Sequence, residues 1–256
     1  MRLVSLTCSN TEIVCALGRG EWLVGVDDHS DYPLEVVARL PRVGPDLGVD
    51  VDAVAALAPD LVLASLTVPG HEAVVARLQR AGLPFIAPAP VSLADTYRDI
   101  RDIARRLGAE AEGERLVASM QAEIGRCRDA TGVRVAEERP PILVEWWPKP
   151  VFVPGGQSWV TDLLVEVGAR NPFDDPDAKS LVVSDERVRL ADPVAIVVAW
   201  CGVDPKKYRL DKVLGRPGWG TTTAVRERRV YAVAEAFLGR PGPRLTDGAR
   251  ALARIV

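Results

Sequence analysis

The chain has 256 residues, of which 48% are hydrophobic and 26% charged, and its formal net charge is −3. This length accommodates either one large domain or two lobes that each have a hydrophobic core. No cluster of lysine and arginine stands out, which argues against a nucleic-acid-binding protein. No apolar run is long enough to cross a bilayer as a helix.

The first half alternates short apolar strands with helices, which is typical of a parallel sheet covered by helices. A capping box at Ser9–Glu12 begins the first predicted helix, and Gly18 ends it. A second helix begins near Asp52, and a third is expected from about His71 to Ala81. The predicted strands are Leu3–Thr7, Leu23–Val26, Leu61–Ala64 and Pro84–Ala87.

The middle of the chain changes to helical spacing from Ser92 onward, with one long amphipathic helix from about Ala109 to Val135. Because no Gly/Ser-rich hinge interrupts it, we expect this helix to join two lobes rigidly. The predicted division is residues 1–95 for an N-terminal lobe, 96–138 for the helical segment and 139–256 for a C-terminal lobe.

The second half returns to alternating strands and helices after Pro140 and Pro141. The predicted strands are Ile142–Trp146, Ala195–Ala199 and Val230–Ala234, with the apolar segment Val151–Val153 after the first of them, and the last helix runs from about Leu245 to Ile255. The fold class expected is therefore α/β, with two Rossmann-like βα lobes that contain parallel sheets and are joined by a single long α-helix.

One pattern occurs in both halves: an acidic residue, six further residues, and a proline that leads into an apolar run. It extends from Asp52 to Pro59 and again from Glu186 to Pro193. An acidic residue at either helix start is explained by the helix dipole alone. The pairing suggests more, namely two similar lobes that each present a carboxylate to a basic site on a two-fold symmetric partner.

The sequence lacks the signatures of an enzyme or a metal site, since GxSxG, P-loop and GxGxxG motifs in the required context are absent. His29 lies among aspartates in what we interpret as a solvated loop, and His71 is expected to cap its helix or face solvent. The cysteines lack CxxC spacing, and they are Cys8, Cys15, Cys127 and Cys201.

Tryptophans mark the candidate ligand site. Trp146, Trp147 and Trp200 follow predicted strands of the second half, at the sheet edge where open α/β sheets bind ligands. Rigid aromatic side chains at that edge suit a bulky, flat, partly apolar ligand. Packing in the core is an equally good explanation for the group, and Trp159 is the member that best fits it.

Two further aromatic residues and two arginines complete the candidate site. Tyr32 and Phe152 lie in loops at the same predicted edge. Arg240 and Arg244 flank a rigid Pro-Gly-Pro turn, which holds at least one guanidinium in place. Capture of a ligand carboxylate or phosphate is one use for them, and attachment of the final helix to the lobe is another.

The order and spacing of several segments resemble those of class III (helical-backbone) ABC-transporter substrate-binding proteins, in the branch that binds vitamin B12 and iron siderophores. The resemblance extends over nearly the whole chain. The matching segments are Asn10–Glu12 with Gly18, Ser30–Pro33, Leu40–Gly44, Asp52–Leu63, Gly155–Gly168, Ser184–Pro193 and Pro243–Arg244.

The resemblance implies a non-enzymatic protein that binds a corrinoid such as cobalamin in a cleft between the lobes and delivers it to an importer. It implies that Asp52 and Glu186 dock to arginine pockets of an ABC permease dimer, which works with its ATPase. The protein is expected to be a monomer without an intrinsic cofactor or metal.

Alternatives stay open for the ligand and for the class of protein. The alternative ligands are an iron siderophore and haem, and the alternative class is an intracellular protein of corrinoid or tetrapyrrole metabolism. The resemblance implies a periplasmic or cell-surface location. The start of the chain shows no signal-peptide pattern, which leaves a cytoplasmic location open.

Overall fold

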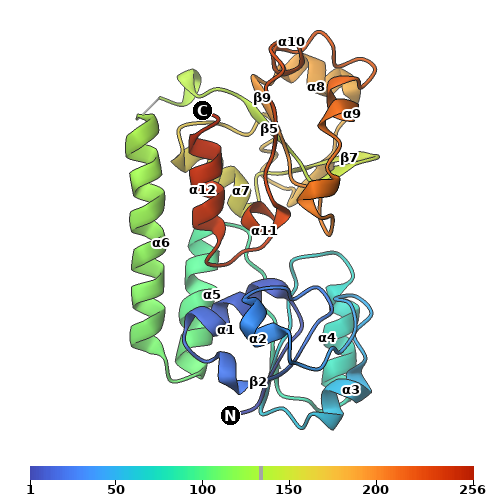
Figure 1. The fold of residues 1–256 in the computed structure, drawn as a ribbon, viewed down its shortest axis with the longest axis vertical. Coiled ribbons are helices and arrows are strands. Elements are labelled where there is room, and N and C mark those ends of the chain that lie inside the picture. Colours follow the sequence, from blue (N-terminus) through green and yellow to red (C-terminus); the bar gives the residue numbers. More distant parts are fainter. Residues whose placement is uncertain (133–134) are drawn as a thin grey trace. The chain divides into compact units, whose positions relative to one another are not determined.

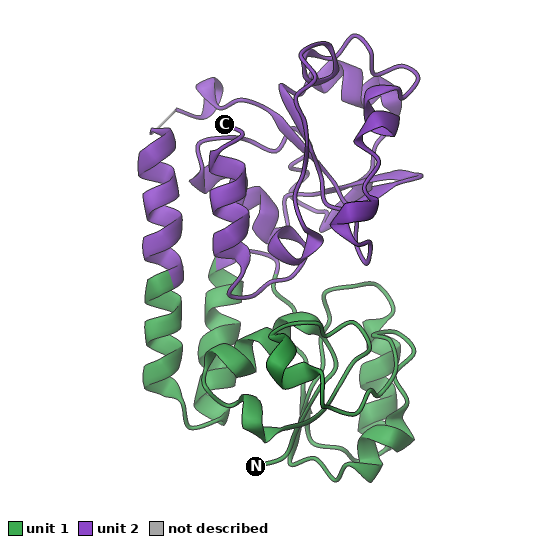
Figure 2. Ribbon diagram, viewed as in Figure 1, with its two compact units in different colours: residues 1–90, 94–119 green, residues 91–93, 120–256 purple. Residues whose placement is uncertain are grey.

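The chain forms two compact units, which Figure 2 distinguishes by colour. Unit 1 contains residues 1–90 and 94–119, and unit 2 contains residues 91–93 and 120–256. The computed structural model describes residues 1–132 and 135–256. The division into lobes at residues 95/96 and 138/139, which the sequence suggests, stays a prediction.

Unit 1 is built on a four-stranded parallel sheet with the strand order β2-β1-β3-β4. Its strands are β1 (Leu3–Ser5), β2 (Leu23–Val26), β3 (Leu61–Leu63) and β4 (Phe85–Ile86) (Figure 1). Valine and leucine side chains suit strands that are covered on both faces. Because the strands are parallel, their carboxyl ends meet at one edge, and the loops that follow them lie there together.

Helices cover this sheet and bury an apolar cluster against it. Val4, Val62 and Leu78 are fully buried in that cluster. The helices of unit 1 are α1 (Cys8–Ala16), α2 (Leu34–Val37), α3 (Val51–Ala56), α4 (His71–Arg80) and most of α5 (Leu93–Arg106).

The long helix α6 (Glu110–Thr131) begins in unit 1, and its residues from Met120 onward belong to unit 2. Within unit 1 it packs closely on α5, where a Cβ atom on Gly113 would lie 2.5 Å from the Cβ atom of Ala104. Only glycine fits there without a shift of the helices. The predicted long helix is confirmed to Thr131, and residues 133–134 of its predicted end lie outside the described residues.

Unit 2 contains two three-stranded sheets. The parallel sheet has the order β10-β9-β5, with β5 (Ile142–Glu145), β9 (Ala195–Val198) and β10 (Val230–Ala232). The second sheet is antiparallel and consists of β6 (Trp147–Pro148), β7 (Val151–Pro154) and β8 (Ser180–Val182). The parallel sheet agrees with the sequence prediction, whereas the small antiparallel sheet was not predicted.

Helices of unit 2 follow its strands, and the predicted α/β fold is confirmed. α8 precedes β9, and α11 and α12 follow β10 at the end of the chain. The helices are α7 (Trp159–Glu166), α8 (Asp185–Ala191), α9 (Leu210–Leu214), α10 (Thr223–Arg226), α11 (Glu235–Leu238) and α12 (Leu245–Ala253).

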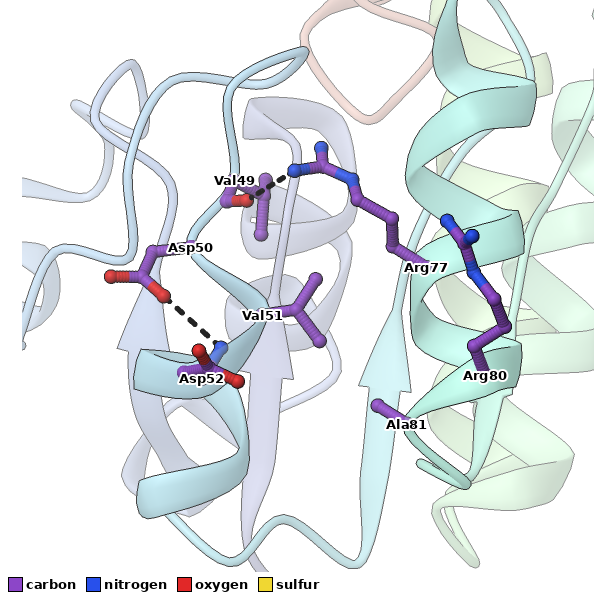
Figure 3. Close-up of a pocket in the computed structure, with 7 residues that line it drawn as sticks. All are labelled: Val49, Asp50, Val51, Asp52, Arg77, Arg80 and Ala81. Atoms are coloured by element: carbon purple, nitrogen blue, oxygen red, sulfur yellow. Dashed lines mark hydrogen bonds between the residues drawn. The ribbon is translucent and has the colours of Figure 1, made fainter.

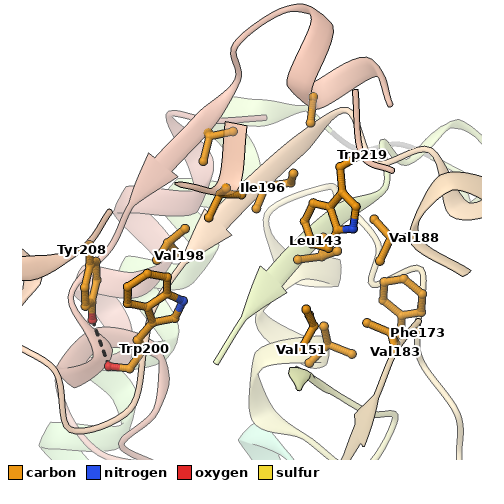
Figure 4. Packing of buried hydrophobic residues seen from close by; sticks show 14 residues of the cluster. Leu143, Val151, Phe173, Val183, Val188, Ile196, Val198, Trp200, Tyr208 and Trp219 are labelled. Carbon is orange, nitrogen blue, oxygen red and sulfur yellow. Dashed lines mark hydrogen bonds between the residues drawn. The ribbon is translucent and has the colours of Figure 1, made fainter. Parts of the chain in front are cut away.

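The core of unit 2 combines aliphatic side chains with four aromatic ones, which are Phe173, Trp200, Tyr208 and Trp219 (Figure 4). Trp219 is fully buried, and Trp200 is buried except for a small edge. The carboxylate of Glu145, at the end of β5, is fully buried and accepts two hydrogen bonds from the Arg216 guanidinium, at 2.5 and 3.0 Å. The same guanidinium lies 4.1 Å from the centre of the Trp219 ring. Such a charge is tolerated in the core only because it is paired and hydrogen-bonded.

The sequence repeat is present in both units as a short helix, a proline and a buried strand. In unit 1, α3 is followed by Pro59 and β3, and in unit 2, α8 is followed by Pro193 and β9. The residue before each proline is left-handed, with φ 45° at Ala58 and φ 39° at Asp192. Non-glycine residues rarely adopt this conformation, so its recurrence strengthens the similarity between the two halves.

Replacement of the largely buried cation Arg216 tests the ion pair. We expect Arg216→Met to lower the free energy of unfolding by about 3–5 kcal/mol, because it leaves the Glu145 carboxylate buried without a counter-charge. Urea unfolding followed by tryptophan fluorescence measures the change. Arg209→Met is the control, since it removes an exposed pair with Asp211 and should cost less than about 1 kcal/mol. Equal losses in both variants would contradict a special role for the buried pair.

The carboxyl group of Asp99 on α5 gives a prediction of pH dependence. Its Oδ2 atom is buried and has no hydrogen-bond partner among the described residues, and burial raises its pKa to about 6. The folded state therefore binds this proton more tightly, and stability falls as pH rises from about 4 to about 6.

We expect Asp99→Asn to raise the free energy of unfolding by about 1–3 kcal/mol near pH 7, and to change it little near pH 3.5. Glu114→Gln, at an exposed site paired with Arg101, is the control and should show no such dependence. A gain at Asp99 that is the same at both pH values would contradict the burial of its charge.

Candidate functional site

The carboxylate of Asp52 lies exposed in the first turn of α3 in unit 1. The helix is capped by Asp50 instead, whose Oδ1 atom accepts hydrogen bonds from the backbone N–H groups of Asp52 and Ala53, both at 3.0 Å. Because Asp50 caps the helix, the carboxylate of Asp52 is not needed for capping. Within the described residues it forms no ion pair, so it is available to a partner.

An open groove of about 450 Å³ lies beside Asp52 (Figure 3). Arg77 and Arg80 extend into its lining from α4. The guanidinium of Arg77 is fixed by hydrogen bonds to the carbonyl oxygens of Val49 and Leu47, both at 3.1 Å. The docking candidate of unit 1 therefore has positive charge near its carboxylate. The residues that line the groove are Val49, Asp50, Val51, Asp52, Arg77, Arg80 and Ala81.

Glu186 is exposed in the first turn of α8 in unit 2, the position that corresponds to Asp52. Here the cap is Ser184, whose hydroxyl oxygen accepts a hydrogen bond from the N–H of Arg187 at 3.2 Å. The neighbouring Asp185 accepts a hydrogen bond from the buried Trp219 indole at 2.7 Å. Both acidic residues of the repeat are thus exposed, as docking requires, while their neighbours hold the helices in place.

Tyr32 lies in the loop that follows β2 in unit 1, and its side chain is 49% exposed. The loop is shaped by Asp27, a fully buried carboxyl group that accepts hydrogen bonds from the Ser30 hydroxyl at 2.5 Å and the His29 N–H at 3.0 Å. Burial raises the pKa of Asp27. Arg42 also donates to the carbonyl oxygens of Asp27 and Ser30. The sequence indicated Tyr32 but missed this buried support.

Trp147 and Phe152 lie directly opposite each other on the antiparallel strands β6 and β7, and Phe152 in turn lies opposite Val182 on β8. Opposed residues share one face of a sheet, so the three side chains form one apolar row. Trp147 is 42% and Val182 48% exposed, whereas the next residues of β7, Val151 and Val153, are buried on the other face. The structure thus brings Trp147 and Phe152 together beside Val182. The expectation that Phe152 lies in a loop was wrong, since it is part of strand β7.

The other predicted tryptophans are more enclosed. The Nε1 atom of Trp200 donates to Glu145 at 2.9 Å, and its ring centre lies 5.5 Å from that of Tyr208. The ring of Trp146 is partly buried and lies 6.5 Å from that of Trp159. Trp159 donates to the carbonyl oxygen of Leu238 at 2.7 Å, which makes it a packing residue. A ligand role for Trp146 and Trp200 stays a prediction.

The two predicted arginines contact α11. The Nε atom of Arg240 lies 3.2 Å from the Glu235 carboxylate, with both side chains largely buried. The guanidinium of Arg244 lies 5.7 Å from the centre of the Phe237 ring. These contacts agree with the structural alternative, in which the arginines hold the last helices. Ligand binding by Arg240 and Arg244 stays a prediction.

The expectation that His71 caps its helix or faces solvent was wrong. Its side chain is buried, its Nδ1 atom accepts a hydrogen bond from Val68 N–H at 3.3 Å, and its Nε2 atom lies 3.4 Å from Asp46. The imidazole holds the pKa of Asp46 below its usual value. Across residues 1–132 and 135–256, no group of three or more His, Cys, Asp or Glu side chains is arranged to hold a metal ion. No helix in those ranges is long and apolar enough to span a membrane.

The chain belongs to the periplasmic binding protein family, whose sequence model matches residues 3–236. It is therefore a binding protein and not an enzyme, as the sequence resemblance predicted. An uncharacterized ABC transporter substrate-binding lipoprotein, YvrC, from Bacillus subtilis (strain 168) is 32% identical over all of this chain and 79% of its own length.

Two further similarities bear on the ligand. A vitamin B12-binding protein from Pectobacterium carotovorum subsp. carotovorum (strain PC1) is 29% identical over 95% of this chain and 84% of its own. The solved apo structure of the periplasmic heme-binding protein RhuT from Roseiflexus sp. RS-1 is 31% identical, with a TM-score of 0.82, over 99% of this chain and 97% of that one.

Proposed function

We propose that this chain is the substrate-binding protein of an ABC importer and that its ligand is a corrinoid. Similarity to YvrC supports the importer, and similarity to the Pectobacterium vitamin B12-binding protein supports the ligand class. The partners are a permease dimer and its ATPase, with Asp52 and Glu186 as docking residues. No resident cofactor is required for binding and delivery.

The observation that carries the ligand proposal is the apolar row Trp147–Phe152–Val182 of unit 2, in which Trp147 and Val182 are exposed and Phe152 is half-buried. A corrin ring is broad, flat and partly apolar, and rigid aromatic side chains bind such a surface with little loss of rotamer entropy. Tyr32 of unit 1 adds a second exposed aromatic ring to the chain's binding surfaces.

Haem is the second candidate, because RhuT is a heme-binding protein. Haem iron commonly takes an axial ligand such as histidine or tyrosine from the protein, and His29 and Tyr32 are exposed in one loop of unit 1. A cobalamin carries its own axial base and needs no protein ligand. A ferric siderophore is less well matched, because anionic chelates require unpaired cationic groups and Arg240 is already paired with Glu235.

Tryptophan fluorescence during titration separates these ligands. We expect cyanocobalamin and cobinamide to quench the fluorescence at lower concentration than hemin or ferric enterobactin, an anionic chelate. Trp147→Ala should weaken corrinoid binding about tenfold, because a large aromatic contact is lost. Trp22→Phe, which changes a tryptophan stacked under Arg19 in unit 1, is the control and should retain wild-type affinity.

Binding of hemin without binding of corrinoids would overturn the corrinoid proposal and favour haem. In that case Tyr32→Phe or His29→Ala should alter the Soret band of the bound hemin, because one of them supplies the axial ligand. With a corrinoid as ligand, Tyr32→Phe should change affinity by less than about threefold, since the ring and its contact area are kept.

Charge reversal tests the docking residues. We expect Asp52→Lys and Glu186→Lys each to weaken association with the reconstituted permease–ATPase complex about a hundredfold, because like charges would then oppose each other across the interface. Ligand affinity should not change. Glu137→Lys, at an exposed residue outside α3 and α8, the two proposed docking helices, is the matched control. Association that is unaffected by both reversals would contradict the docking assignment.

A further inference from the structure

We propose that the docking surface of unit 2 is formed by Glu186 together with Leu190, and that it fits a partner surface in which a basic side chain lies beside an apolar pocket. The two residues are four positions apart on α8, so they lie on one face of the helix. Leu190 is 81% exposed, and Val188 between them is fully buried and faces the core. This inference rests on the proposed docking role of Glu186.

α8 is a fixed support for this surface because it is held at both ends. At its start, Asp185 accepts the hydrogen bond of the buried Trp219 indole at 2.7 Å. At its end, the Asp192 carboxylate accepts hydrogen bonds from the N–H and the hydroxyl of Thr223, at 2.6 and 3.0 Å. A helix held in this way loses little conformational entropy when a partner covers it.

Charge complementarity defines the partner. The Glu186 carboxylate has no ion-pair partner in the part of the chain that the structure describes, although two arginines follow it on the same helix. A guanidinium or ammonium group of the partner would satisfy it. Once that pair forms, the isobutyl group of Leu190 lies one turn away and is covered with it, so an apolar depression beside the basic group matches this face.

The two units differ in this respect. The residue four positions after Asp52 is Ala56, which offers little apolar area, and the groove beside Asp52 contains Arg77 and Arg80. The docking surface of unit 1 therefore offers a carboxylate without an apolar contact beside it, whereas that of unit 2 combines a charge with an apolar contact. Added salt should weaken the interactions of the Asp52 and Glu186 carboxylates with the permease. The contribution of Leu190 to the binding affinity should not depend on salt.

Binding to the permease–ATPase complex of the source genome in nanodiscs, measured by biolayer interferometry, tests the inference. We expect Leu190→Ser to weaken binding about tenfold at low and high salt, and Leu190→Met to restore it. Leu34→Ser, which changes an exposed leucine outside both docking helices, should bind within twofold of the wild type. Urea unfolding and corrinoid titration of each variant verify that the fold and the ligand site are intact.

Two results would overturn the inference, and they differ in what else they imply. If Leu190→Ser binds like the wild type while Glu186→Lys does not bind, the apolar contact is absent but docking through Glu186 stands. If Glu186→Lys also binds like the wild type, docking through this helix fails and the inference fails with it.

Discussion

The buried ion pair between Glu145 and Arg216 is the constraint on which the candidate surfaces of unit 2 depend. Glu145 ends β5 at the carboxyl edge of the parallel sheet, and its carboxylate also accepts the Trp200 indole hydrogen bond. Arg216 packs on Trp219, which in turn holds Asp185 at the start of α8. One buried charge pair thus orients a candidate ligand residue and the helix that carries Glu186.

In unit 1, the candidate site residues are oriented by hydrogen bonds around a buried carboxyl group. Asp27 follows β2 and organises the loop of His29 and Tyr32: its carboxyl group accepts hydrogen bonds from the Ser30 hydroxyl and the His29 N–H, and its backbone carbonyl accepts one from Arg42. In both units, therefore, a buried acidic residue at or just beyond the end of a parallel strand shapes the adjoining segment. The carboxyl groups of Asp27 and Glu145 each accept hydrogen bonds from more than one donor. Burial of a charged or polar group requires such partners.

The sequence predicted the elements whose signal is local. Apolar runs and the repeated proline indicated strands and helices of both parallel sheets, and the repeat correctly indicated two exposed carboxylates, Asp52 and Glu186. The capping box predicted at Ser9–Glu12 was wrong, because α1 begins at Cys8 after the N-cap residue Thr7 and both Ser9 and Glu12 are buried inside the helix. It did not predict β6 or β8, because strands of two and three residues show no usable periodicity. It also missed the Glu145–Arg216 pair and the Trp219–Asp185 hydrogen bond, since these contacts join residues 71 and 34 positions apart.

Transport itself tests the central claim most directly. The measurement is the uptake of radiolabelled cyanocobalamin into proteoliposomes that contain the permease and ATPase of the source genome. The account predicts ATP-dependent uptake that requires the addition of this protein and saturates with it. Uptake that is equal with and without the protein, or that occurs with hemin and not with cyanocobalamin, would contradict it.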